Sequence, residues 1–256
     1  MKLAISGKGG VGKTTIASLL CRGIEYRGRE VIAIDADSNP NLAGALGFPA
    51  PEQITPLSEM KDLIRQKMGI ERGAFGPYFR MNPDVSDIPE RFRQVSGRVQ
   101  LLVMGAIARG DSGCACPEFA LIRSLISYLL LNKDQDMVVD MEAGLEHLGR
   151  GVAEKVDALL IVVQPDRVSC LTAIRIHQLA RDLHIQNICG IGNRITGDSD
   201  LQYLQRQALP FQFISYFPAC DLIRQSERDG SNLFAIPALR QEAENLIAHL
   251  AEKADG

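Results

Sequence analysis

The sequence lacks a hydrophobic run long enough to cross a membrane, an excess of one charge, and any internal repeat or low-complexity tract. Its longest apolar helical stretch, near residues 121–131, is shorter than a membrane span and contains Arg123. The 28 basic and 31 acidic residues leave a formal net charge of −3, which provides no general basic field for nucleic acid or anionic lipid. We therefore expect neither a membrane nor a nucleic acid as partner.

Signs of secretion are also lacking. No signal peptide precedes the first expected strand, which begins at Lys2. Six cysteines without a secretory context are more typical of free thiols than of a disulfide framework. These absences favour a cytoplasmic protein. With 46% hydrophobic residues the chain can build a full core, and we expect residues 1–256 to form a single domain.

Short apolar stretches alternate with amphipathic ones along most of the chain. The stretches that we interpret as strands are residues 2–6, 31–34, 99–104, 137–140, 158–163, 188–192 and 213–216. Helical periodicity covers residues 14–27, 57–67, 119–131, 172–183 and 238–250. Strands separated by helices predict an α/β fold with a mostly parallel central sheet and helices on both of its faces.

Residues 48–98 interrupt this alternation. The segment contains six prolines and only one clear helical pattern, so it differs from the strand–helix units on either side. We interpret it as a proline-rich insertion within the domain, and we expect it to lie over the carboxyl edge of the sheet. Its composition does not indicate a function.

The most informative motif is the loop GKGGVGKTT at residues 7–15, between the first strand and the first helix. Its pattern of glycine, four residues and Gly-Lys-Thr is typical of a loop that cradles phosphates. Lys13 is expected to neutralise the β and γ phosphates, and the Thr14 hydroxyl to bind Mg²⁺. The loop therefore predicts a nucleotide site, held by Gly9, Gly10, Val11, Gly12, Lys13, Thr14 and Thr15.

Three aspartates follow strands whose carboxyl ends should meet at the edge that holds this loop. Asp35 and Asp37 follow the second strand, and Asp140 ends the strand at residues 137–140. Asp140 fits a carboxylate that holds Mg²⁺ through water, and Asp35 would support the metal's ligand shell. One aspartate at a strand end could equally cap a helix, but three around a phosphate loop favour a hydrolytic site.

Cys114 and Cys116 form a second motif, followed directly by Pro117. Cysteines one residue apart rarely form a disulfide with each other, because the linkage is strained. Proline favours the first position of a helix, and a helix N-terminus lowers the pKa of a nearby thiol. Two thiolates do not complete a four-ligand metal shell, but a two-fold dimer supplies the other two. The pair indicates either a metal site shared by two chains or two idle cysteines.

The phosphate loop carries a second lysine, Lys8, directly after its first glycine. In this respect it resembles the deviant Walker A motif of the MinD, ParA and NifH superfamily of P-loop NTPases. The resemblance implies ATP as substrate and a dimer in which Lys8 reaches the partner's nucleotide. It also implies that Asp37 is the switch I aspartate that orients the attacking water. Asn193, Arg194 and Pro218 match base-contacting positions, with arginine in place of the usual lysine.

Three further segments narrow the resemblance: ITPLSEM at residues 54–60, the Cys-Ala-Cys motif, and DMEAGLEHL at residues 140–148. Together with the loop they resemble the CooC family of ATPases, which mature nickel carbon monoxide dehydrogenase, and the related AcsF proteins, which serve acetyl-CoA synthase. The resemblance spans essentially the whole chain. It implies a homodimeric ATPase with slow turnover that binds Ni²⁺, or Zn²⁺ in vitro, through Cys114 and Cys116 at the dimer interface. Its client would be the apo form of either enzyme. Glu142 occupies a position where some relatives carry glycine.

Two other functions stay open at this point. A positioning ATPase of the MinD or ParA type needs a basic amphipathic C-terminal helix or a local basic patch, whereas the tail here has an acidic balance. An iron–sulfur ATPase of the NifH or Mrp type places its cysteines in two separate loops or in Cys-x-x-Cys pairs. The motifs of this chain favour the nickel-insertion ATPase over both.

Overall fold

The structure is a computed structural model that describes residues 1–70, 79–105, 117–145, 148, 153–229 and 232–254. Its strands are β1 (Lys2–Gly7), β2 (Val31–Ala36), β3 (Gln94–Ser96), β4 (Val99–Val103), β5 (Asp136–Met141), β6 (Ala158–Val163), β7 (Ile188–Ile195) and β8 (Gln212–Pro218). Each strand expected from the sequence is present within a few residues of its expected bounds, and β3 is additional.

The α-helices of the described residues are α1 (Lys13–Tyr26), α2 (Leu42–Ala45), α3 (Lys61–Met68), α4 (Ile88–Phe92), α5 (Pro117–Asn132), α6 (Arg167–Asp182), α7 (Asp198–Arg206), α8 (Leu222–Asp229) and α9 (Pro237–Ala254). Short 3₁₀ turns are η1 (Pro51–Gln53), η2 (Leu57–Glu59), η3 (Ala153–Lys155) and η4 (Leu233–Ala235). The helix expected from residue 172 begins earlier, at Arg167. The reason is a cap, because the Asp166 carboxylate accepts the Ser169 N–H at 2.8 Å.

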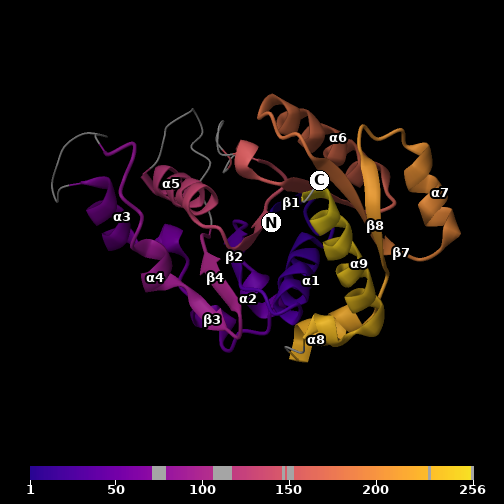
Figure 1. The fold of residues 1–256 in the computed structure, drawn as a ribbon, viewed down its shortest axis with the longest axis horizontal. Coiled ribbons are helices and arrows are strands. Elements are labelled where there is room, and N and C mark those ends of the chain that lie inside the picture. Colours follow the sequence, from indigo (N-terminus) through magenta and orange to yellow (C-terminus); the bar gives the residue numbers. More distant parts are fainter. Residues whose placement is uncertain (71–78, 106–116, 146–147, 149–152, 230–231, 255–256) are drawn as a thin grey trace.

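Within the described residues the strands form one sheet in the order β3-β4-β2-β5-β1-β6-β7-β8 (Figure 1). All neighbouring pairs are parallel except β3 and β4, which are antiparallel at one edge. β1 lies between β5 and β6, so the loop that follows β1 emerges near the middle of the sheet's carboxyl edge. The expected mostly parallel α/β sheet is therefore confirmed.

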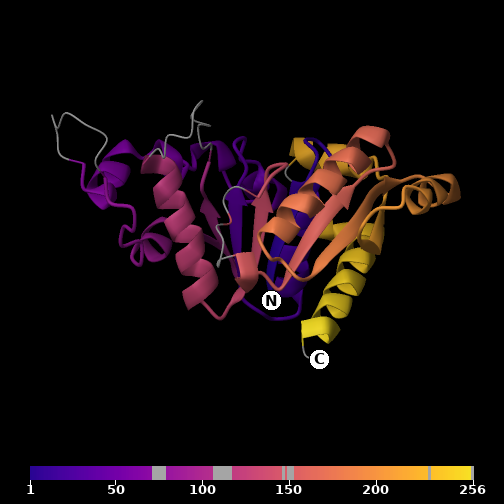
Figure 2. The same ribbon diagram turned by 90° about the horizontal axis from the view of Figure 1, so that it is seen from above.

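Helices cover both faces of the sheet. One core cluster joins α3, α5 and α6 to side chains such as Ala4 and Val139, and the other joins α1 and α9 to side chains such as Leu3 and Val138. Successive residues of a strand point to opposite faces, which is why Leu3 and Ala4 belong to different clusters. Figures 1 and 2 place α3 and α7 at opposite ends of the long axis.

The proline-rich segment 48–98 divides between two places. The Ser58 N–H donates to the Met104 carbonyl at 3.0 Å, so the residues around Ser58 lie at the carboxyl end of β4, as expected. The later part lies elsewhere: α3 packs against α5, and β3 joins the sheet as its edge strand beside β4. The expectation that the whole segment covers the carboxyl edge is thus only partly right. Pairing with the open edge of β4 gives the backbone of β3 hydrogen-bond partners.

The last helix contributes to the core. Leu239, Leu246 and Ile247 of α9 are buried in the cluster that contains α1, and α9 also contacts β8. The apolar face of α9 is therefore occupied by its own domain. Across the described ranges, no helix combines the length and the apolar character that a membrane crossing requires.

Candidate active site

The phosphate loop connects the last residue of β1, Gly7, to the first residue of α1, Lys13. Gly10 and Gly12 have φ values of +76° and +99°, in the left-handed region that favours glycine. Gly12 is the N-cap of α1, and no side chain caps this helix. The first N–H groups of α1 are thus available to an anion, and the helix dipole adds partial positive charge there.

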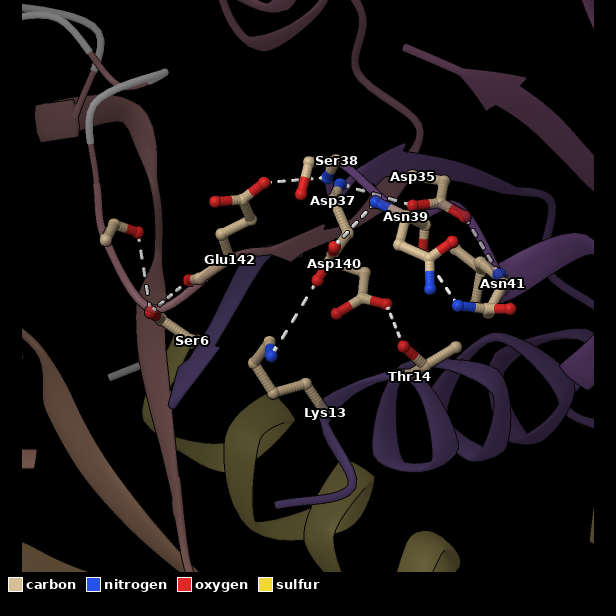
Figure 3. A network of polar contacts seen from close by, with 12 residues as sticks. Ser6, Lys13, Thr14, Asp35, Asp37, Ser38, Asn39, Asn41, Asp140 and Glu142 are labelled. Atoms are coloured by element: carbon tan, nitrogen blue, oxygen red, sulfur yellow. Dashed lines mark hydrogen bonds and ion pairs between the residues drawn. The ribbon is translucent and has the colours of Figure 1, made fainter. Parts of the chain in front are cut away.

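Strand register brings two of the predicted carboxylates together. In the pairing of β2 with β5, Asp35 lies directly opposite Asp140, and in the pairing of β1 with β5, Ile5 lies opposite Asp140. Asp140 therefore sits between the second strand and the strand that feeds the phosphate loop. The Thr14 hydroxyl donates to Asp140 Oδ2 at 2.6 Å (Figure 3). The three residues meet at the carboxyl edge of the sheet, as expected.

Asp140 and Asp35 are both buried. Burial raises the pKa of Asp140 to about 7, and the neighbouring charge of Asp35 acts in the same direction. Burial also raises the pKa of Asp35 to about 6, although the Leu42 N–H donates to its Oδ2 at 2.8 Å. The raised pKa values indicate that nearby positive charge does not fully balance the negative charge of these two buried carboxylates.

The donor set at Thr14 and Asp140 fits Mg²⁺. Asp140 Oδ1 is buried and has no hydrogen-bond partner within the described part of the chain. A buried orphan oxygen beside a hydroxyl is the kind of environment that a hard cation satisfies. Thr14 and Asp140 would therefore hold the metal that accompanies the nucleotide, and Mg²⁺ there would neutralise charge on the phosphates.

Asp37 lies on the same side as these carboxylates and faces Lys13 of the phosphate loop. Its Oδ2 is 3.8 Å from Lys13 Nζ, and the exposed fractions of the two side chains are 22% and 7% (Figure 3). Asp37 Oδ1 accepts the Asn39 N–H at 3.0 Å, and the Asp37 N–H lies 3.3 Å from Asp35 Oδ1. The carboxylate is therefore held close to Lys13 while staying partly open to solvent, from which a water molecule can approach.

A cavity of about 1070 Å³ opens beside the loop, which is ample for a nucleotide. Its walls come from the phosphate loop, the loop after β2, the start of the proline-rich segment and the C-terminal part of the chain. The lining residues are Gly9, Gly10, Gly12, Lys13, Thr14, Thr15, Asp37, Asn39, Asn41, Gly44, Ala45, Gly47, Phe48, Pro49, Pro51, Arg194, Ser226 and Leu233. The start of the proline-rich segment therefore lies at the nucleotide site, through Phe48, Pro49 and Pro51. The composition of the segment did not indicate this position.

The three expected base-contacting residues have different surroundings. Asn193 is buried, and its Nδ2 donates to the Val11 carbonyl at 2.8 Å, so its amide group supports the phosphate loop. Arg194 lines the cavity, and its Nη1 lies 3.4 Å from Gln164 Oε1. Pro218 ends β8 and is not among the lining residues. Their contacts with the base stay predictions.

Lys8 lies in the phosphate loop, where its carbonyl accepts the Val11 N–H at 3.2 Å and its side chain is half-buried. Its role toward a partner chain stays a prediction. Cys114 and Cys116 lie outside the described residues, but Pro117 is the first residue of α5, as the proline rule predicts. Elsewhere in the described chain, no three His, Cys, Asp or Glu side chains gather in a way that could hold a metal ion.

Glu142, together with Ser6 and Ser38, connects the loops of the site, and the sequence assigned none of these three residues a role there. The Ser6 hydroxyl donates to the Glu142 carbonyl at 2.8 Å, and the Ser38 N–H donates to Glu142 Oε1 at 2.8 Å (Figure 3). No local spacing predicts contacts between such distant residues. The signal in the sequence was Glu142 itself, a carboxylate two residues after Asp140.

These features define a P-loop nucleotide-binding protein. It has a mostly parallel sheet and a glycine-rich loop before a helix that no side chain caps. Lys13 and the carboxylates near Thr14 are the groups that an ATPase uses. The family model for the CobQ/CobB/MinD/ParA nucleotide binding domain matches residues 2–202. The chain belongs to this family and, within it, groups with CooC. It is 41% identical over 256 residues to the carbon monoxide dehydrogenase accessory protein CooC of Rhodospirillum rubrum, covering 99% of this chain and 97% of that protein.

Other relatives agree with this assignment. An uncharacterised ATP-binding protein of Methanocaldococcus jannaschii is 38% identical over 252 residues, covering 98% of this chain and 97% of the relative. Among solved structures, MinD of Pyrococcus horikoshii complexed with Mg-ADP has a TM-score of 0.69 at 18% identity, with 99% and 97% of the two chains covered. The MinC:MinD complex of Aquifex aeolicus gives 0.68 at 20% identity, with 98% and 96% covered. These structural likenesses establish the MinD-like fold.

Proposed function

We propose that this chain is a cytoplasmic, slowly hydrolysing ATPase that forms a homodimer, binds nickel, and assists nickel insertion into apo carbon monoxide dehydrogenase or acetyl-CoA synthase. The observation that carries the proposal is the 41% identity to CooC of Rhodospirillum rubrum along 99% of the chain. That relative is an accessory protein of carbon monoxide dehydrogenase, and the match extends beyond the shared ATPase segment at residues 2–202.

The arrangement around Lys13 supports the hydrolytic part of this proposal. Lys13 and the N–H groups at the start of α1 would bind the β and γ phosphates. Asp37, held 3.8 Å from Lys13 Nζ, would orient the attacking water from the partly open side of the cavity. Phosphoryl transfer depends on positioning and charge neutralisation, so an ordinary carboxylate is sufficient for this role.

The metal-binding part rests on Cys114 and Cys116. Each chain contributes two thiols, and a four-ligand shell needs two chains. The cysteines belong to the connection between β4 and α5, and this connection starts beside the nucleotide site, because the Met104 N–H donates to the Asp35 carbonyl at 2.8 Å. A change at the aspartates on ATP binding or hydrolysis would therefore act on the first residues of the connection.

The alternative of a MinD-like membrane-positioning ATPase is less well supported. Such a protein needs a C-terminal helix whose apolar face is free to enter a membrane. In this chain Leu239, Leu246 and Ile247 of α9 are buried in the core with α1. The likeness to MinD structures concerns the fold, whereas the identity to CooC extends along the chain.

A nickel titration tests the proposed function. The reduced protein, titrated with Ni²⁺ alone under anaerobic conditions, should bind half an equivalent per chain and develop thiolate-to-nickel charge-transfer absorbance. Mass photometry should detect metal-dependent dimers. The double variant Cys114→Ala, Cys116→Ala should lose both signals and still bind ATP. Cys220→Ala, at a half-buried free cysteine elsewhere, should keep them. One tightly bound Ni²⁺ per monomer, or undiminished binding by the double variant, would contradict the shared site.

A further inference from the structure

Glu142 connects three segments of the nucleotide site. It lies two residues after Asp140, where β5 has just ended, and its side chain is partly buried. Its backbone carbonyl accepts the hydroxyl of Ser6, the residue before the phosphate loop, at 2.8 Å. Its side-chain Oε1 accepts the Ser38 N–H, also at 2.8 Å (Figure 3). One residue thus joins the base of the phosphate loop to the loop after β2.

The contact with Ser38 bears directly on Asp37, the preceding residue. The Asp37 N–H has a long contact of 3.3 Å with Asp35 Oδ1, and Asn39 donates to the Asp37 carboxylate itself. All three contacts have a carboxylate oxygen as acceptor, but the bond from Ser38 to Glu142 is the shortest of them, and of the three it is the one that reaches the residue after β5. It is therefore a principal anchor that joins this loop to β5.

We propose that Glu142 is a positioning residue for ATP hydrolysis. By holding the backbone at Ser38, it keeps the Asp37 carboxylate facing Lys13 and the phosphate loop. Glu142 acts through Asp37 and not on the nucleotide. Without the Glu142 side chain the Ser38 N–H loses this acceptor, and the loop keeps its contacts with the carboxylates of Asp35 and Asp37. This inference rests on the proposed role of Asp37 in hydrolysis.

Steady-state ATP turnover with saturating Mg²⁺ tests the inference. Glu142→Ala should lower kcat about tenfold, the effect of losing one hydrogen bond, while KM for ATP changes less than about twofold. Glu142→Gln should restore kcat to within about twofold of the wild type, because its amide oxygen can accept the same N–H. Glu142→Asp keeps the charge but is one methylene shorter, so it should be as slow as Glu142→Ala. Glu252→Ala, at an exposed glutamate of α9, serves as the matched control and should behave as wild type.

The outcomes separate the inference from the proposed function. An inactive wild type, or an Asp37→Ala variant with wild-type turnover, would contradict the ATPase mechanism. If wild type is active and Asp37→Ala is not, the Glu142 variants decide the inference alone. Wild-type turnover by Glu142→Ala, equal loss in the Gln and Ala variants, or an effect on KM instead of kcat would overturn it. If Glu142→Ala does not show a native thermal transition, the Asp and Gln variants decide in its place. A slow Asp variant together with a near-normal Gln variant supports the inference. Equal turnover of the two variants overturns it.

Discussion

Asp140, Asp35 and Asp37 carry the same functional group in three different surroundings. Asp140 is buried, and one of its oxygens lacks a hydrogen-bond partner among the described residues. Asp35 is also buried, but it accepts backbone N–H groups. Asp37 is partly exposed and lies beside Lys13. Burial disfavours the charged form, whereas a nearby cation favours it. The different surroundings therefore fit these carboxylates to different roles. The buried pair is suited to the ligand shell of a metal ion, and Asp37 is suited to contact with a water molecule.

The raised pKa of Asp140 makes its metal binding dependent on pH. Asp140 would hold Mg²⁺, through water, in its ionised form, so the proton must leave first. Because the pKa of Asp140 is about 7, most of this group is protonated near pH 6 and ionised near pH 8. The affinity of the ADP-bound protein for Mg²⁺ should therefore be about tenfold weaker near pH 6 than near pH 8. Calorimetric titration with Mg²⁺ at both pH values measures this change.

The nucleotide phosphates also titrate in this range, which calls for a matched control. Asp140→Asn has a neutral side chain of the same shape, so it should bind Mg²⁺ more weakly at both pH values and show only the pH dependence of the nucleotide. Subtracting this residual dependence isolates the contribution of Asp140. A wild type whose corrected affinity is equal at the two pH values would show that Asp140 does not need to lose a proton.

At the scale of secondary-structure elements, the amino ends of the central strands are joined far from the nucleotide. The amino group of Met1 donates to Asp136 Oδ1 at 2.5 Å, and Arg29 Nη2 donates to the same oxygen at 2.7 Å. The side chains of Met1 and Asp136 are almost completely buried there. These contacts connect the starts of β1, β2 and β5 at the edge of the sheet opposite the active site.

Asp136→Asn should therefore lower stability without changing nucleotide binding. The asparagine keeps an acceptor oxygen but loses the buried charge that pairs with the amino group of Met1 and with Arg29, and we expect the free energy of unfolding to fall by about 2 kcal/mol. Urea denaturation measures the fall, and fluorescence titration with ADP should give an unchanged affinity.

Asp157→Asn is the control for this variant at the same edge. Asp157 Oδ2 accepts the Lys2 N–H at 2.7 Å at an exposed position, so the substitution should change the free energy of unfolding by less than about 0.5 kcal/mol. Equal effects at the two positions would show that the buried charge of Asp136 has no special part in holding the strands.

At the scale of the whole molecule, Lys8 carries the prediction of an ATP-dependent dimer. Lys13 of the same chain is expected to reach the phosphates, and the described residues supply no ion-pair partner for Lys8. If Lys8 neutralises the partner's phosphates, Lys8→Ala should still bind ATP as a monomer. It should lose ATP-driven dimerisation and most of its hydrolysis, about a hundredfold or more, as expected for a lysine that acts like an arginine finger.

Light scattering with ATP and Mg²⁺ measures the mass of this variant, and phosphate release measures its turnover. Lys61→Ala, at an exposed lysine of α3, is the control for loss of a surface charge and should dimerise and hydrolyse ATP as wild type does. A Lys8→Ala protein that still forms the ATP-dependent dimer and turns over normally would leave Lys8 as an ordinary solvent-facing lysine.

Local features were readable from the sequence because neighbouring residues specify them. The glycine pattern at residues 7–15 predicted the phosphate loop, Pro117 predicted a helix start, and alternating apolar stretches predicted the parallel sheet. The sequence did not predict several additional elements that are short or mostly polar: β3, α2, α4, α7 and α8. Burial of apolar side chains is a weak signal in such segments, and pairing or packing with distant parts of the chain decides their conformation.

The tertiary structure alone decided how distant residues meet. Asp35 faces Asp140 through strand register, Asn193 bonds to Val11 across 182 positions, and Glu142 reaches Ser38 across 104. By itself, the sequence determined the fold class, the phosphate loop and which carboxylates reach its edge of the sheet, because these follow from residue spacing and strand ends. It left open the raised pKa of Asp140 and the link at Glu142, because burial and hydrogen bonding depend on which strands become neighbours in the folded sheet.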